Sequence, residues 1–196
     1  MNIFVVDSDP FIAAQSLCDA HVCKMIVESC QLLSTQDRLE GLTGGRYKAT
    51  HVNHPCRKCL ENRANRFWLR LHLMGLLEEY TFRFGKTHKC QELFDRYWNN
   101  WDDWSFFSQE FPQYTGRALF DFLIPILIHF TDFPACMPDE VKNISRLYCF
   151  PGINSVVSAY REYYRYKKRT MKRWKYTNRE EPSWLEEERY GMAAMS

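Results

Sequence analysis

The sequence has no hydrophobic run long enough to cross a membrane, no internal repeat and no low-complexity stretch. Its longest apolar run, residues 118–130, is interrupted by Asp121 and Pro125 and falls short of the ~20 apolar residues of a spanning helix. We expect this run to be a buried core helix with a proline kink. The first residues also lack the basic stretch and cleavage site of a secretory signal, so neither export nor membrane attachment is expected.

Disulfide bonds are not expected either, although the chain holds eight cysteines. Cys18, Cys23 and Cys30 are spaced as in a helix and have apolar neighbours, which is typical of reduced, packed thiols. A chain of 196 residues, 45% of them hydrophobic, can build a core without cross-links. We therefore expect a cytoplasmic protein with reduced cysteines.

Strand-like alternation is weak along the chain, so the predicted fold class is mainly α. We expect a single compact multi-helix domain over residues 1–196, with a short extended segment at residues 1–6. Asp7 to Pro10 can cap the first helix, and Gly85 is placed to end a later one. The predicted helical regions are residues 11–33 (as one helix or two), 56–84, 91–104, 112–137 and one that begins at Pro138.

Four polar side chains share one face of the first long predicted helix. His21, Lys24, Glu28 and Gln31 follow one another at intervals of three, four and three residues, which places them on the same side. One interpretation is a solvent-exposed face joined by a Lys24–Glu28 ion pair. The other is an active-site face, because these side chains can serve as acid, base, amine and reader of a base edge.

A second polar run, residues 48–55, leads into the next predicted helix and contains His51, Asn53 and His54. Backbone amides at a helix start favour a phosphate or a carboxylate, so this run is a candidate substrate-binding loop. The alternative is that Thr50 or Asn53 only caps the helix.

A zinc site is another interpretation of this region, because His51 and His54 lie just before Cys56 and Cys59. The two cysteines fall one turn apart on a predicted helix, and no later loop supplies a matching pair. We therefore expect no metal and no other cofactor.

Positive charge is concentrated in residues 160–179, which hold nine Lys or Arg, one acid (Glu162) and interleaved tyrosines and tryptophan. Basic residues that contact phosphates and aromatic rings that stack on bases are what a nucleic-acid surface needs. The alternative is an amphipathic helix whose aromatic side is core. The candidate phosphate contacts are Arg165, Lys168, Lys172 and Lys175 in this segment, and Arg46, Lys48, Arg83, Lys86 and Lys89 elsewhere.

Three short motifs occur in the order and spacing of a known family. They are Asp19, then Lys24-x-x-Val27-Glu28-x-x-Gln31-x-Leu33, then Asn53-His54-Pro55, with His21 seven residues before Glu28. In these motifs the chain resembles the pyrimidine-dimer DNA glycosylase (endonuclease V-like) family of phages and bacteria. The resemblance covers about the first 60 to 90 residues. The last third of the chain has no counterpart in it, so recognition of the dimer is not carried over.

The resemblance implies a reaction in which the N-terminal amine attacks C1′ of the sugar and a helix glutamate assists. Glu28 then takes the role of the glutamate, and the amine belongs to Met1, because Asn2 is a bulky neighbour for removal of Met1. Lys24 is a second candidate amine and His21 a further catalytic candidate. Asp19, Gln31, Asn53, His54 and His51 are the implied substrate-binding residues.

The expected function is therefore that of a DNA base-excision enzyme, a glycosylase with possible strand-nicking activity, acting on a base flipped out of DNA. Two alternatives remain open at this point. One is a phage-type enzyme that modifies a base or nucleotide on the same fold, and the other is a nucleic-acid-binding module without catalysis.

Overall fold

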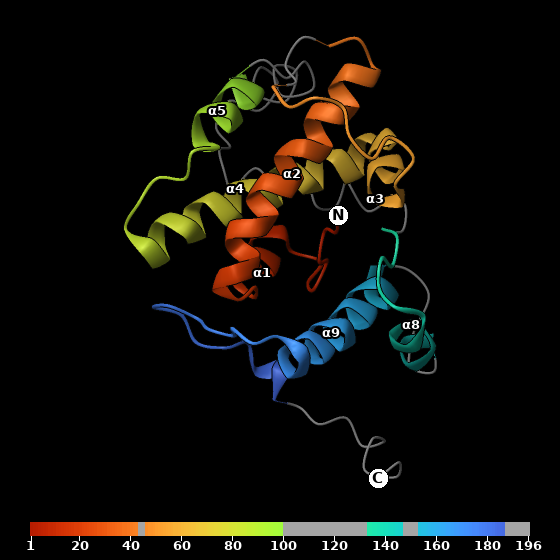
Figure 1. The fold of residues 1–196 in the computed structure, drawn as a ribbon, viewed down its shortest axis with the longest axis vertical. Coiled ribbons are helices and arrows are strands. Elements are labelled where there is room, and N and C mark those ends of the chain that lie inside the picture. The colour runs from red at the N-terminus through yellow and green to blue at the C-terminus, as the bar shows by residue number, and fades with distance from the viewer. Residues whose placement is uncertain (43–45, 100–132, 147–152, 187–196) are drawn as a thin grey trace.

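The computed structural model describes residues 1–42, 46–99, 133–146 and 153–186 (Figure 1). Over these residues the protein is mainly helical and has no β-strand, so the predicted fold class is confirmed. The apolar core helix predicted at residues 118–130 lies outside the described ranges, as does the end of the helix predicted at 91–104.

The first predicted helical region forms two helices, α1 (Pro10–Gln15) and α2 (Asp19–Leu39). Asp9 caps α1, because its carboxylate accepts hydrogen bonds from the amides of Phe11 and Ile12, and Pro10 is the first helical residue as predicted. α2 continues six residues beyond the predicted end at Leu33.

The second predicted helix, residues 56–84, is wrong as a single element. The chain forms α3 (Pro55–Lys58), the 3₁₀ turn η1 (Cys59–Glu61) and then α4 (Arg63–Phe84). Asn62 causes the break: its backbone is extended, and its side chain accepts hydrogen bonds from the amides of Ala64 and Asn65. α4 ends at Gly85, whose left-handed φ of 62° suits glycine.

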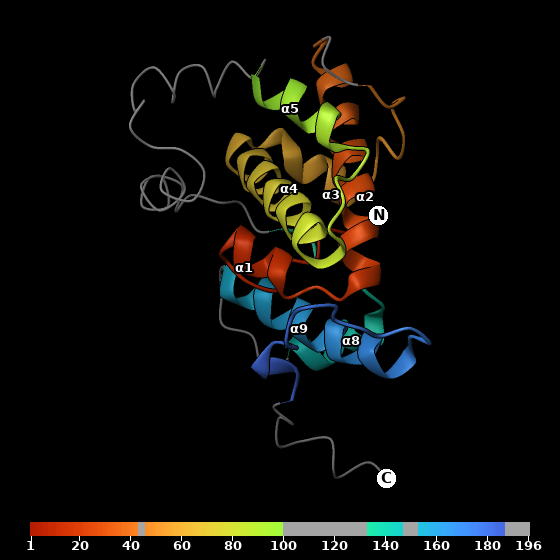
Figure 2. The same ribbon diagram turned by 90° about the vertical axis from the view of Figure 1, so that its left-hand side faces the viewer.

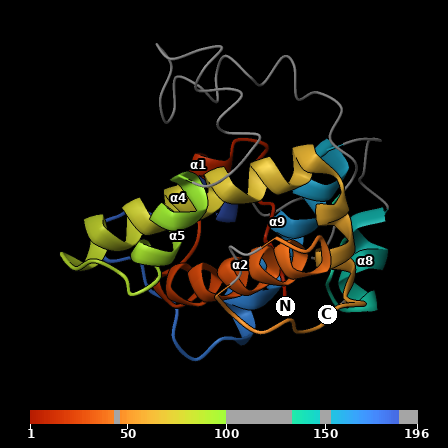
Figure 3. The same cartoon turned by 90° about the horizontal axis from the view of Figure 1, so that it is seen from above.

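The remaining helices are α5 (Gln91–Asn99), α8 (Asp139–Arg146), which begins where predicted, α9 (Ile153–Thr170) and the 3₁₀ turn η2 (Ser183–Leu185). α4 packs against α1 and α2, and Figure 3 shows α2 and α4 side by side. α8 and α9 form a second pair at the opposite end of the molecule from α5 (Figure 2). None of the described helices combines the length and the apolar character needed to cross a bilayer.

The N-terminal segment, residues 1–6, has no regular secondary structure and lies between α2 and α9 (Figure 1). It turns at Phe4, whose φ is 44° and whose carbonyl accepts from the amide of Val6 at 2.8 Å, so the predicted extended segment is interrupted there. Phe4 is buried there, 4.6 Å from the ring of His21 on α2 and 5.8 Å from the ring of Tyr163 on α9. The hydrophobic core is continuous from this segment to η2. Burial of the segment brings the first residue of the chain to the middle of α2.

Candidate active site

Glu28 lies in the middle of α2, and its two carboxylate oxygens face two different nitrogen groups. One oxygen is 3.4 Å from the ammonium of Lys24, which confirms the predicted ion pair. The other accepts a hydrogen bond from the backbone nitrogen of Asn2 at 3.1 Å. The Glu28 side chain is 15% exposed and that of Lys24 is 56% exposed, so the carboxylate is half-enclosed with the lysine on its open side.

Asn2 holds the start of the chain beside Glu28. Its side-chain oxygen accepts from the amides of Ile3 and Phe4, and its side-chain nitrogen donates to the carbonyl of Cys136 at 2.7 Å. Met1, one residue before this contact, is partly buried against the core. Sequence reasoning treated Asn2 only as an obstacle to removal of Met1 and missed its positioning role, for which a buried asparagine next to the terminus is the sole signal.

His54 belongs to the same group. Burial lowers the pKa of His54, the positive charges of the N-terminal amine and of His51 lower it further, and the negative charge of Glu28 opposes them. His54 is also the N-cap of α3, because its Nδ1 accepts from the amide of Cys56. The predicted cap at Thr50 or Asn53 is thus wrong by one to four residues.

The other implied substrate-binding residues have separate positions. Gln31 is partly exposed on α2, one turn beyond Glu28. His51 and Asn53 are exposed in the loop before α3, and the His51 ring lies 6.4 Å from that of His54. The structure therefore brings Lys24 and the Asn2 amide into contact with Glu28, places Gln31 one turn further along α2, and leaves His51 and Asn53 exposed in the loop before α3.

His21 does not belong to this group, so its assignment as a catalytic residue is wrong. It is only 4% exposed, and its Nδ1 lies 2.8 Å from the hydroxyl of Tyr164 on α9. Burial lowers the pKa of His21 to about 4, and the charges of Lys24 and Lys167 contribute. The ring is a neutral part of the core because residues of α9 cover this side of the helix.

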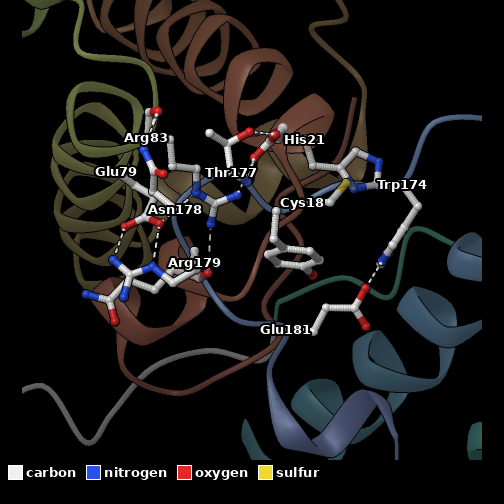
Figure 4. Close-up of polar contacts among 12 residues, drawn as sticks. Cys18, His21, Glu79, Arg83, Trp174, Thr177, Asn178, Arg179 and Glu181 are labelled. Carbon is white, nitrogen blue, oxygen red and sulfur yellow. Dashed lines mark hydrogen bonds and ion pairs between the residues drawn. The ribbon is translucent and has the colours of Figure 1, made fainter.

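Asp19 and Arg83 are structural rather than ligand-binding, contrary to their assignments (Figure 4). Arg83 is 2% exposed and donates to Asp19 at 3.0 Å and to Glu79 at 2.7 Å. Asp19 also accepts from the amide and the hydroxyl of Thr177. Although burial raises the pKa of Asp19, these hydrogen bonds and the Arg83 charge lower it below its usual value.

Glu79 completes this network and was missed by sequence reasoning. Its carboxylate accepts from Arg83 and, at 2.7 and 2.6 Å, from Arg179 (Figure 4). The network joins α4 and the start of α2 to the extended segment that follows α9, residues 171–182. In the sequence Arg179 belongs to the basic stretch, and its pairing with Glu79 leaves no local pattern because the two residues are 100 positions apart.

The basic segment is less free to bind phosphate than predicted. Arg165 pairs with Glu162, and Lys168 pairs with Glu181, so a carboxylate already compensates each of these charges. Lys172 and Lys175 are exposed, and neither forms an ion pair with any residue in the described ranges. The buried aromatic side of α9 confirms the core interpretation for part of the segment, namely Tyr160, Tyr163 and Tyr164.

The remaining basic candidates lie on the surface away from Glu28. Lys48 and Lys86 are exposed. Arg46 and Lys89 line a hollow of about 510 Å³, together with Tyr47 and Cys90. Arg46 lies 3.7 Å from Glu92, an exposed pair that leaves its charge partly compensated. None of the residues that line this hollow belongs to the group around Glu28.

Comparison of the chain with protein-family models, with curated proteins and with solved structures finds no match. The functional evidence is therefore the geometry around Glu28 together with the sequence motifs.

Proposed function

We propose that the protein is a DNA base-excision enzyme that uses an amine next to Glu28 as its nucleophile. The observation that carries the proposal is that the Glu28 carboxylate lies 3.4 Å from the Lys24 ammonium and accepts a hydrogen bond at 3.1 Å from the Asn2 peptide amide, one residue from the terminal amine. A carboxylate beside an amine, partly shielded from water, is the pairing that an imine-forming glycosylase needs. The resemblance to the dimer glycosylases supports the same pairing.

In the proposed reaction the amine lone pair attacks C1′ of a nucleotide that has been flipped out of the stack. A bond forms between the amine and C1′, the glycosidic bond breaks, and its electron pair leaves with the base, which takes up a proton. The sugar ring then opens to an imine. Loss of a proton from C2′ and cleavage of the C3′–O bond nick the strand. Glu28 stabilises the cationic sugar and carries protons in these steps.

The nucleophile is assigned to the N-terminal amine rather than to Lys24. Asn2 holds the terminus against Glu28 through three hydrogen bonds of its side chain, whereas the Lys24 side chain is more than half exposed and free to move. With Met1 in place the amine is that of Met1. If Met1 is removed, the amine becomes the Asn2 nitrogen that already contacts Glu28.

Borohydride trapping tests the reaction. The protein is incubated with abasic duplexes and with duplexes that carry modified bases, and the imine is reduced to a stable protein–DNA adduct. We expect an adduct on the N-terminal peptide, located by mass spectrometry, and we expect Lys24→Ala to retain it. A variant extended by a few residues ahead of Met1 should lose the adduct, because its amine is displaced from Glu28.

The control is an extended variant that still binds duplex DNA with unchanged affinity, so that loss of the adduct reports on chemistry. An adduct on Lys24 would reassign the nucleophile within the same reaction. Absence of any adduct on all substrates that the protein binds would refute the imine mechanism. Release of a free base separates base excision from base modification.

A further inference from the structure

Three metal-binding side chains converge next to the N-terminus. The sulfur atoms of Cys56 and Cys136 lie 3.3 Å apart, and the ligand atoms of His54, Cys56 and Cys136 all lie within 4.8 Å of one another. His54 and Cys56 come from the start of α3, and Cys136 comes from the segment before α8, 80 residues later. Only the tertiary structure brings them together.

The spacing suits a small tetrahedral ion. Zinc binds sulfur at about 2.3 Å and imidazole nitrogen at about 2.0 to 2.1 Å, so ligand atoms around it are separated by roughly 3.3 to 3.8 Å. Two sulfur ligands of one tetrahedral ion are separated by about 3.8 Å, so the cysteine sulfurs must move apart by about 0.5 Å, and shifts of about 1 Å bring the imidazole into range. Cys56 is buried, while His54 and Cys136 are partly exposed, so an ion can enter.

Hydrogen bonds to backbone groups hold the two segments that carry these three side chains. Nδ1 of His54 accepts from the Cys56 amide and fixes the ring at the start of α3. The carbonyl of Cys136 accepts from Asn2 at 2.7 Å. The hydroxyl of Tyr160 donates to the carbonyl of Pro134 at 2.8 Å, which holds the same segment against α9. A cluster held in this way needs little reorganisation to bind an ion.

We propose that His54, Cys56 and Cys136 bind one zinc ion, which fastens the segment before α8 to the start of α3. The proposal replaces the metal-free expectation from sequence, which assumed that no later residue joins Cys56. Two thiolates neutralise a divalent cation, so the positive amine nearby does not oppose binding. Cys59, one turn after Cys56, lies outside the cluster, and its thiol donates to the Cys56 carbonyl at 3.2 Å, so the fourth position is left to water. The inference does not depend on base excision.

The test is the metal content of the untagged, reduced, full-length protein after stripping with a chelator and titration with Zn²⁺. We expect one zinc ion per chain by elemental analysis. Co²⁺ in place of Zn²⁺ should give a thiolate-to-cobalt charge-transfer band. Cys136→Ser and His54→Ala should each bring the metal content to near zero, because a tetrahedral site with few protein ligands cannot lose one.

Cys23→Ser is the matched control, since Cys23 is a partly exposed thiol on α2 outside the cluster, and it should keep its zinc. Far-ultraviolet circular dichroism verifies that each variant is folded, and the Co²⁺ band of the wild type tests the site even where a variant fails to fold. Wild-type protein that binds no zinc, or a Cys136→Ser variant that keeps it, would overturn the proposal. So would a Cys56–Cys136 disulfide in protein freshly isolated from the cell.

Discussion

Glu79→Gln should destabilise the protein far more than Glu92→Gln. Both glutamates pair with an arginine four residues later on the same helix, Glu79 with Arg83 at 2.7 Å and Glu92 with Arg96 at 2.6 Å. Both pairs span one helical turn, but Glu79 also accepts two hydrogen bonds from Arg179, whereas Glu92 has only a 3.7 Å contact with exposed Arg46 besides Arg96. The side chain of Glu79 is 3% exposed and that of Glu92 is 62% exposed.

The loss of unfolding free energy depends on the charge that stays buried when the Glu79 carboxylate is removed. Removal of one partner from a buried ion pair costs about 3–5 kcal/mol, because the other charge stays buried without compensation. Arg83 keeps its contact with Asp19 at 3.0 Å, so we expect about 2–4 kcal/mol for Glu79→Gln. An exposed helical pair contributes only about 0.3–0.5 kcal/mol, which sets the expectation for Glu92→Gln.

Urea unfolding followed by circular dichroism measures both changes. With an m-value of about 2 kcal/mol per molar urea, the midpoint of Glu79→Gln should fall by roughly 1–2 M, whereas that of Glu92→Gln should hardly move. Limited proteolysis should also cut residues 171–182 faster in Glu79→Gln, because Arg179 loses the carboxylate that holds this segment. Equal losses in the two variants would refute the reasoning that burial decides the strength of these pairs.

Three further predictions concern chemistry, binding and pH. Glu28→Gln should slow base release by ~10²-fold or more while DNA affinity stays within a few-fold, as single-turnover assays and titrations measure. Lys172→Ala with Lys175→Ala should reduce the salt dependence of DNA binding by about 2 in the log–log slope. Unfolding free energy should fall as pH drops from 6.5 to about 4, because the unfolded chain protonates His21 and the folded protein does not. His21→Phe should remove the His21 share of this loss, up to ~1.4 kcal/mol per pH unit, and leave the share of His72, whose pKa burial lowers to about 3.

Each of these predictions has a matched comparison. Loss of both activity and affinity in Glu28→Gln would indicate a folding defect, and full activity would exclude Glu28 from catalysis. Arg165→Ala should leave the salt slope unchanged, because that side chain is paired with Glu162. An unchanged slope in the double lysine variant would move the DNA surface to the exposed residues Lys48 and Lys86. A His21→Phe variant with the acid sensitivity of the wild type would assign that sensitivity to another group.

Local signals in the sequence were sufficient for most of the fold. The sequence correctly predicted the start of α1 at Pro10 after the Asp9 cap, the end of α4 at Gly85 and the start of α8. Caps and helix ends depend on neighbouring residues, so local patterns predict them. The break at Asn62 was missed, since an asparagine inside an apolar pattern is a cap only when the backbone is extended there. The Lys24–Glu28 pair was also predictable, because helix geometry fixes contacts four residues apart.

Tertiary packing decided which polar residues are surface and which are core. Helical periodicity placed His21 on the same face as Glu28. In the fold, α9 covers one end of that face, and the hydroxyl of Tyr164 forms a hydrogen bond with the ring of His21. The sequence suggested that Arg83 and Arg179 are available to bind phosphate, but in the fold both donate to the buried carboxylate of Glu79. The sequence alone determined that Glu28 lies beside an amine on its own helix. Only the fold decided that the first residue and Cys136 reach the same place, because contacts over 26 and 80 residues depend on how the helices pack and leave no local pattern.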